Sequence, residues 1–132
     1  LGISLQKKEK NVYVLDGDGA VIMQMGTLAI LGTEAGKNLK HILINNGSHD
    51  SVGGQPTAGF KVDFPAVAKA CGYELTLTAE TKEEIIECIE KMKSSEGAAF
   101  LEIKVNKGAR SNLGRPDVSP LENKLNFMKS LS

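Results

Sequence analysis

Residues 14–26, "VLDGDGAVIMQMG", join one apolar run to another through two aspartates and two glycines. The first run has the composition of a buried strand, and the second has apolar residues at helical spacings. Gly17 and Gly19 allow backbone N–H groups to approach an anion, and the helix N-terminus behind them favours negative charge. The carboxylate of Asp18 would repel that anion unless a divalent cation lay between the two. This stretch therefore predicts a cation as well as an anion where the strand meets the helix.

A second stretch, "HILINNGSHDSVGGQ" (residues 41–55), offers further oxygen ligands for such a cation. In an open α/β sheet, ligands bind beyond the carboxyl ends of the strands, and both stretches leave a strand at that edge. Asn46 supplies an amide oxygen without adding charge, and the bend after it lets the Ser48 carbonyl point at the same place. Asp18, Asn46, the Ser48 carbonyl, two phosphate oxygens and a water complete the six-oxygen shell of a hard cation. The two stretches together predict a magnesium diphosphate site.

The rest of the chain alternates between strand and helix patterns. We expect strands at 11–16, 39–45, 73–78 and 98–106, helices at 20–35, 64–72, 81–96 and from near Ser119 onward, and a loop at 46–63. Connections of this kind suit parallel pairing, so the predicted fold class is a three-layer α/β/α sandwich with a mainly parallel sheet. We expect residues 1–132 to form a single domain, in which 107–132 are a C-terminal extension. Its final helix is expected to bury Leu121, Leu125 and Met128.

The composition excludes several classes of protein. Sixteen basic and sixteen acidic residues cancel, so no bulk charge attracts nucleic acid or an anionic membrane. No apolar run is long enough to span a membrane and no export signal opens the chain, so we expect a cytoplasmic protein. Cys71 and Cys88 are expected to be free thiols. The opening "LGISLQKKEK" resembles the last turns of a helix without an N-cap, so we expect a longer parent protein.

The pair of motifs GDG (17–19) and NN (45–46) resembles the cofactor signature of thiamin-diphosphate enzymes. Within them, the stretches "HDSVGGQPT" (49–57), "FPAVAKACGY" (64–73) and "NLGRPDVSPLENKLNFM" (112–128) are similar to the phosphonopyruvate decarboxylase family. The resemblance implies a thiamin-diphosphate-binding fold, with thiamin diphosphate and Mg²⁺ as cofactors. It implies decarboxylation of a 2-oxo acid, phosphonopyruvate, to phosphonoacetaldehyde and CO₂.

The resemblance also implies that this chain is the diphosphate-binding half of the enzyme. The other half, on the same chain or on a partner subunit, would hold the pyrimidine ring and supply the catalytic glutamate. The family context further implies a homo-oligomer. By the same resemblance Asp18, Asn46 and the Ser48 carbonyl match the metal ligands, and the residues expected to bind the cofactor are Gly17, Asp18, Gly19, Ala20, Asn46, Ser48 and His49. Ala20 departs from the serine that many thiamin enzymes carry there.

Several other polar residues can be given expected roles. His49 and Asp50 lie on the loop that would close over the thiazolium ring, so they are candidates for a catalytic role. Asp16 is expected to orient the loop through hydrogen bonds to the backbone, and Asn45 to be structural. His41, inside a strand, is expected to be an edge or packing residue. Arg110 and Arg115 are read as surface charge, with anion binding as the other interpretation.

Two alternatives to this function stay open. A sulfopyruvate decarboxylase subunit would use the same chemistry, because sulfonate and phosphonate differ mainly in charge and shape. A receiver-like signalling module would place Mg²⁺ and a phosphoryl acceptor near Asp16 and Asp18, with Lys104 or Lys107 close by. That alternative does not explain the glycines on either side of Asp18, nor Asn46 and the long loop after it.

Overall fold

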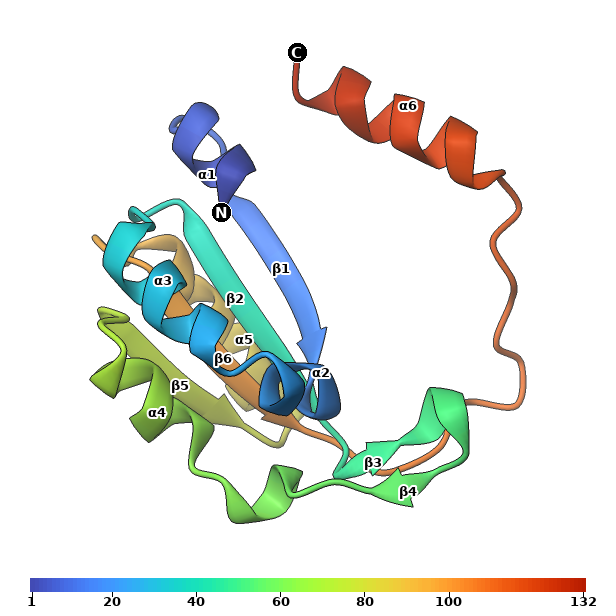
Figure 1. The fold of residues 1–132 in the computed structure, drawn as a ribbon. Helices are drawn as coiled ribbons and strands as arrows, with labels where there is room; N and C mark the ends of the chain where they lie inside the picture. Colours follow the sequence, from blue (N-terminus) through green and yellow to red (C-terminus); the bar gives the residue numbers. More distant parts are fainter.

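A four-stranded parallel sheet forms the centre of the protein (Figure 1), seen here in a computed structural model of residues 1–132. Its strands are β1 (Val12–Gly17), β2 (Leu39–Asn45), β5 (Leu75–Ala79) and β6 (Ala99–Lys104), in the order β1-β2-β6-β5. Every pairing in this sheet is parallel, so all four carboxyl ends meet at one edge. Each predicted strand is present, with small differences at its ends.

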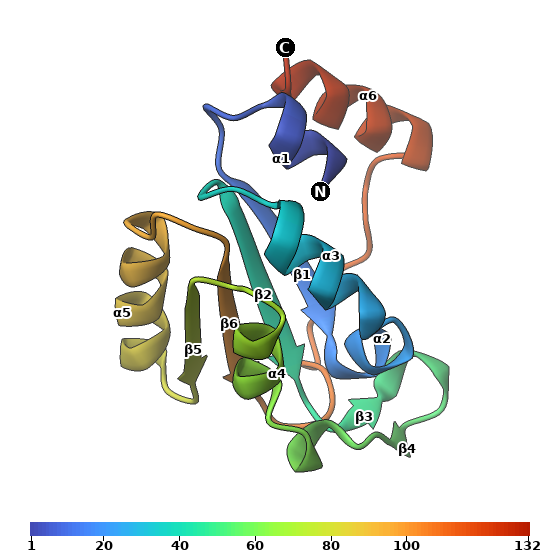
Figure 2. The same cartoon turned by 60° about the vertical axis from the view of Figure 1, so that its left-hand side comes forward.

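Helices cover both faces of the sheet (Figure 2). On one face lie α2 (Asp18–Met23), α3 (Gly26–Glu34) and α4 (Phe64–Ala70), and on the other lies α5 (Lys82–Lys93). Leu28, Leu43 and Phe100 belong to the core under the first group, and Leu101 and Met92 to the core under α5. The predicted three-layer α/β/α sandwich is therefore confirmed.

The single helix predicted at 20–35 is in fact two helices, and the first begins at Asp18. The break is at Gln24, whose φ of −124° and ψ of 34° are not helical. Both the backbone N–H and the hydroxyl of Thr27 donate to the Gln24 carbonyl, at 2.9 and 2.8 Å. These two bonds close a tight turn from Gln24 to Thr27, and Gly26 within this turn has low helix propensity. Local hydrogen bonds thus interrupt an apolar spacing that continues across the break.

The segment predicted as a loop at 46–63 contains a short antiparallel hairpin. Its strands are β3 (Ser48–His49) and β4 (Gln55–Pro56). The 3₁₀ turn η1 (Asp50–Val52) lies between them, and a second, η2 (Gly59–Lys61), follows β4. Thr57 N–H donates to the Gly47 carbonyl at 3.0 Å and closes the base of the hairpin. Gly47 has a φ of +64°, a left-handed conformation that glycine adopts without strain. The excursion is therefore ordered, and it lies at the carboxyl edge of the sheet.

Two helices lie at the other end of the sheet, near the termini: α1 (Gly2–Gln6) and α6 (Pro120–Ser130). The final helix begins where predicted, but the expected burial of Leu121, Leu125 and Met128 is wrong. These side chains are 64%, 55% and 54% exposed, because an extended segment carries α6 away from the sheet (Figure 1). The C-terminal end of α6 is held by Lys10, whose Nζ donates to the Ser130 carbonyl at 2.7 Å.

Two further expectations concern the whole chain. Cys71 and Cys88 are free thiols, as predicted. None of the helices combines the length and the apolar composition that crossing a membrane requires.

Candidate cofactor-binding site

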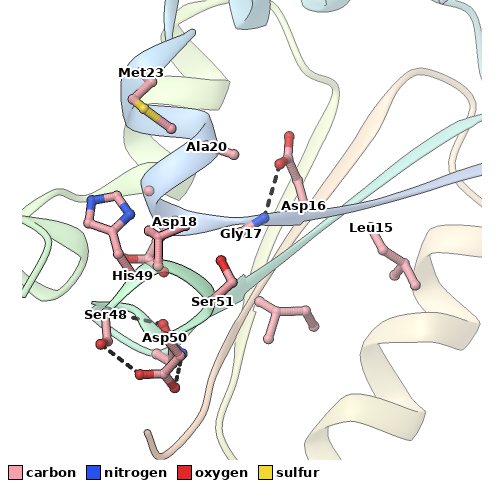
Figure 3. Close-up of a pocket in the computed structure, with 14 residues that line it drawn as sticks. Leu15, Asp16, Gly17, Asp18, Ala20, Met23, Ser48, His49, Asp50 and Ser51 are labelled. Atoms are coloured by element: carbon pink, nitrogen blue, oxygen red, sulfur yellow. Dashed lines mark hydrogen bonds between the residues drawn. The ribbon is translucent and has the colours of Figure 1, made fainter. Parts of the chain in front are cut away.

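An open pocket of about 580 Å³ lies at the carboxyl edge of β1 and β2, between the start of α2 and the hairpin (Figure 3). It brings together every residue predicted for the site. Its lining consists of Leu15, Asp16, Gly17, Asp18, Gly19, Ala20, Met23, Ile44, Asn46, Ser48, His49, Asp50, Ser51 and Val52. Arg110 and Arg115 are not part of this lining.

Asp18 is the most deeply placed acidic residue of the pocket, with only 2% of its surface exposed. It directly follows β1, so the parallel sheet fixes its position at the carboxyl edge. The Thr57 hydroxyl donates to its Oδ2, whereas its Oδ1 accepts no hydrogen bond from the protein. A β-carbon at Gly17 would meet no atom within 4 Å, so the space beside its Cα is open, but its N–H is donated to Asp16 Oδ1. Asp18 can therefore offer one carboxylate oxygen to a bound group.

The two asparagines after β2 have different environments. Asn45 is fully buried, and its Nδ2 donates to Glu102 Oε1 at 2.7 Å and to the Gly59 carbonyl at 2.9 Å. These bonds confirm that Asn45 is structural. Asn46 is half-buried in the pocket wall, and its Oδ1 accepts from Ser48 N–H at 3.0 Å. An amide oxygen has two lone pairs, so Asn46 keeps one for a ligand.

Asp50 is the centre of a small hydrogen-bond network rather than a free carboxylate. It accepts from Gly108 N–H at 2.8 Å, from the Ser48 hydroxyl at 2.8 Å and from Asn46 Nδ2 at 3.0 Å. The bond from Gly108 N–H, followed by that from the Ser48 hydroxyl, holds the pKa of Asp50 below its ordinary value. A general base is most effective when its pKa is near the working pH, so this environment favours an organising role. The catalytic role suggested for Asp50 remains an untested prediction.

His49 stands beside Asp18, below the start of α2 (Figure 3). Its ring makes no hydrogen bond within the protein and packs against Gly19. A β-carbon at position 19 would lie 2.4 Å from the His49 ring, so a larger residue there would displace the ring from this position. The second glycine of the GDG motif thus makes room for His49, whose ring nitrogens stay available to a bound group.

The half-buried Asp16 of the pocket lining faces the buried His41. Asp16 Oδ1 accepts from Gly17 N–H at 3.0 Å, which confirms the expected backbone contact. Asp16 Oδ2 lies 3.5 Å from Nε2 of His41, and His41 Nδ1 lies 3.0 Å from the Tyr73 hydroxyl. Burial lowers the pKa of His41, although the Asp16 carboxylate acts in the opposite direction. Because β2 lies between β1 and β6, His41 is a packing residue and the edge alternative is wrong.

Sequence reasoning missed two residues that the structure connects to the site. Thr57 contacts Asp18, and Glu102 contacts Asn45 from β6. Glu102 is only 3% exposed, and the one available signal was a carboxylate within the apolar run "AAFLEIKV". Lys104, which the receiver-like alternative needed near the aspartates, lies 3.2 Å from Glu80 and does not line the pocket.

A parallel sheet covered on both faces, with a glycine-flanked carboxylate and an oxygen-rich loop at its carboxyl edge, defines an α/β domain of the cofactor-binding class. Comparison with known protein families shows which cofactor-binding family this domain belongs to. The chain belongs to the family of thiamine pyrophosphate enzymes, as their C-terminal TPP binding domain, and the family model matches residues 1–103. The predicted resemblance is confirmed, and the receiver-like alternative is set aside.

Three curated relatives are similar to most of this chain. A phosphonopyruvate decarboxylase of Streptomyces viridochromogenes is 38% identical over 92% of this chain and 30% of its own length. A sulfopyruvate decarboxylase of Methanosarcina acetivorans is 33% identical, over 99% of this chain and 34% of its own length. A sulfopyruvate decarboxylase subunit beta of Methanococcus maripaludis is 30% identical, over 98% of this chain and 69% of its own length. The chain therefore spans about a third of the length of each of the first two relatives.

Proposed function

We propose that this chain is the diphosphate-binding half of a thiamin-diphosphate-dependent 2-oxo acid decarboxylase, with phosphonopyruvate as substrate and phosphonoacetaldehyde and CO₂ as products. The observation that carries the proposal is the buried Asp18 carboxylate, with one oxygen uncommitted, in the same pocket as Asn46 and Ser48. The similarity to phosphonopyruvate decarboxylases over most of the chain supports the substrate. We further propose that residues 1–132 are one domain, with 107–132 as its extension, in a cytoplasmic protein.

The charge of the pocket supports Mg²⁺ as a second cofactor. Its lining includes three carboxylates, those of Asp16, Asp18 and Asp50, and neither lysine nor arginine. A diphosphate would be repelled by this set, whereas a divalent cation would be attracted to it and would then bind the diphosphate. The oxygens of Asp18, Asn46 and the Ser48 backbone are hard ligands of the kind that Mg²⁺ prefers. The hairpin partner of Ser48 is Pro56, which has no N–H to donate to the Ser48 carbonyl.

Each part of the pocket then has a task. When bound, thiamin diphosphate would supply the electron-accepting ring that allows CO₂ to leave a 2-oxo acid. Asp18, Asn46 and the Ser48 carbonyl would hold the cation, and the backbone at Gly17 and Gly19 would face the diphosphate. His49 would contact the diphosphate or the substrate through its free ring nitrogens. Asp50 would keep the loop that carries Asn46 and Ser48 in position through its hydrogen bonds.

The exposed apolar rim of the pocket supports a second, pyrimidine-binding half. Leu15, Met23 and Val52 line the pocket and are 73%, 68% and 71% exposed. No glutamate lines the pocket, so the catalytic glutamate of the proposed mechanism must come from the other half. We propose that this half, on the same chain or a partner subunit, covers the rim and excludes water, and that the complete enzyme is an oligomer.

A second substrate is supported by a specific observation. The sulfopyruvate decarboxylase subunit of Methanococcus maripaludis matches 98% of this chain, including the C-terminal extension. The test is to measure kcat/KM of the complete enzyme with phosphonopyruvate and with sulfopyruvate, following the aldehyde product. We expect phosphonopyruvate to be preferred. A preference for sulfopyruvate would assign the enzyme to the second substrate, and no aldehyde from either would contradict the proposal.

A further inference from the structure

The hydroxyl of Thr57 has a fixed direction, because both of its neighbours are known. It accepts a hydrogen bond from Gly59 N–H at 3.0 Å, and an N–H can only donate. Its single proton is therefore free to point at Asp18 Oδ2, which it contacts. Thr57 thus fixes one oxygen of Asp18 and leaves Oδ1 without a partner.

The hairpin explains how Thr57 reaches Asp18, which is 39 residues earlier in the chain. β3 and β4 reverse the chain, and the N–H of Thr57 then donates to the Gly47 carbonyl at 3.0 Å. Gly47 lies between Asn46 and Ser48, the two other proposed metal ligands. Thr57 is therefore bonded through its backbone to one ligand segment and through its hydroxyl to the other.

Gly59 keeps Thr57 and Asp18 in this arrangement. A β-carbon at position 59 would lie 2.4 Å from Asp18 Oδ2 and 2.4 Å from Asn45 Oδ1, so a side chain would displace one of them. The Gly59 N–H is held by Thr57 and its carbonyl by Asn45 Nδ2, at 3.0 and 2.9 Å. The glycine is thus required for a close approach, and the donor to Thr57 cannot easily move.

We infer that Thr57 is a positioning residue for Asp18, which holds Oδ2 so that Oδ1 faces the cation of the proposed cofactor site. The inference rests on the proposed function, because the proposed function is what places a metal ion beside the Asp18 carboxylate. Loss of a partner that orients a metal ligand typically lowers metal affinity about 10-fold to 100-fold.

The test compares Thr57→Val, which removes the hydroxyl at similar volume, with Thr57→Ser, which keeps it, in the complete enzyme. The measurement is the Mg²⁺ concentration that gives half-saturation of thiamin diphosphate binding, read by calorimetry without substrate. We expect Thr57→Val to raise this concentration roughly 10-fold to 100-fold and Thr57→Ser to stay near wild type. Thr33→Val is the matched control, because the Thr33 hydroxyl bonds only to the Ala29 carbonyl on an exposed face of α3.

Thermal unfolding without cofactor shows whether each variant is folded, and Thr57→Ala replaces Thr57→Val if valine prevents folding. A folded Thr57→Val or Thr57→Ala enzyme with the wild-type Mg²⁺ requirement would overturn the role of Thr57 alone. A wild-type enzyme that bound thiamin diphosphate without any need for a divalent cation would overturn the proposed site itself, and this inference with it. The two failures are therefore distinguishable in one set of titrations.

Discussion

Neighbouring residues of the same type have different roles in this pocket, and their hydrogen bonds distinguish those roles. Asn45 is fully buried with its amide committed to Glu102 and Gly59, whereas Asn46 is half-buried with an oxygen lone pair free. Asp16 likewise bonds to the backbone and faces His41, whereas Asp18 keeps one oxygen uncommitted. A substitution at Asn46 should therefore affect ligand binding, and one at Asn45 should affect folding.

We predict that Asn46→Leu abolishes Mg²⁺-dependent binding of thiamin diphosphate and leaves the fold intact. The change removes an oxygen ligand from a side chain that has little contact with the core. The measurement is cofactor affinity of the full-length variant in magnesium buffer, with circular dichroism as the check on folding. Wild-type affinity in a folded variant would show that Asn46 is not a metal ligand.

His41 should make stability depend on pH. Its pKa in the folded protein lies below the ordinary value of 6.5, because burial disfavours the charged ring. Folding therefore favours the neutral form, and the stability that His41 contributes is present above about pH 6.5 and decreases as the pH falls below that value. Asp16 and Tyr73 are the titratable groups that face the ring, and Asp16 reduces the effect.

The measurement is the free energy of unfolding at pH 7.5 and pH 5.5, for wild type and His41→Gln. We expect wild type to lose more stability than the variant between these two pH values. An equal loss in both proteins would show that His41 is not responsible for the pH dependence.

At the scale of elements, the hairpin β3–β4 and the segment after β6 form one unit with the pocket. Val105 N–H donates to the Asn45 carbonyl at 2.8 Å, and Gly108 N–H donates to Asp50 at 2.8 Å. The C-terminal extension is thus attached at its base to the loop that carries Asn46 and Ser48. Beyond this point the extension is exposed until Lys10 contacts the end of α6.

Removal of the Asp50 carboxylate should release the base of the extension. We predict that Asp50→Ala accelerates tryptic cleavage after Lys107 and Arg110 several-fold, because the bond from Gly108 N–H is lost. The control is Asp117→Ala, since Asp117 is exposed in the same extension and makes no hydrogen bond through its side chain. Equal cleavage rates in Asp50→Ala, Asp117→Ala and wild type would show that Asp50 does not hold the extension.

The strands and the main site residues could be predicted from the sequence for simple physical reasons. A strand buried on both faces, such as β2, is a nearly continuous apolar run, and parallel strands place their following residues at one edge. The break between α2 and α3 depends on a local turn that the apolar spacing does not reveal. An amphipathic pattern identified the apolar side of α6 but not what that side contacts.

Long-range contacts explain what sequence reasoning missed in the site. Thr57 meets Asp18 across 39 residues, and Glu102 meets Asn45 across 57 residues. Threonine is ordinary in a loop, so no local pattern marks Thr57, and the only signal for Glu102 is a carboxylate within an apolar run. Their positions depend on the hairpin and on the neighbouring strand order, which become visible only in the folded chain.

At the scale of the whole molecule, the pocket has the features of one side of a larger site. Its rim is apolar and exposed, its lining contains no glutamate, and the chain spans about a third of the decarboxylases that it resembles. A diphosphate bound here alone would leave both rings of thiamin in water, with their apolar area unburied. Cofactor binding by residues 1–132 alone should therefore be weaker than by the complete enzyme.

A coupled aldehyde assay with phosphonopyruvate, saturating thiamin diphosphate and Mg²⁺ can decide whether this chain is one half of a decarboxylase. Residues 1–132 are assayed alone and then with the remaining part of the enzyme, supplied on the same chain or as a separate one. We predict no decarboxylation by residues 1–132 alone, and aldehyde formation once the other half provides the glutamate and covers the rim. Clear turnover by residues 1–132 alone would contradict the assignment of this chain as the diphosphate-binding half.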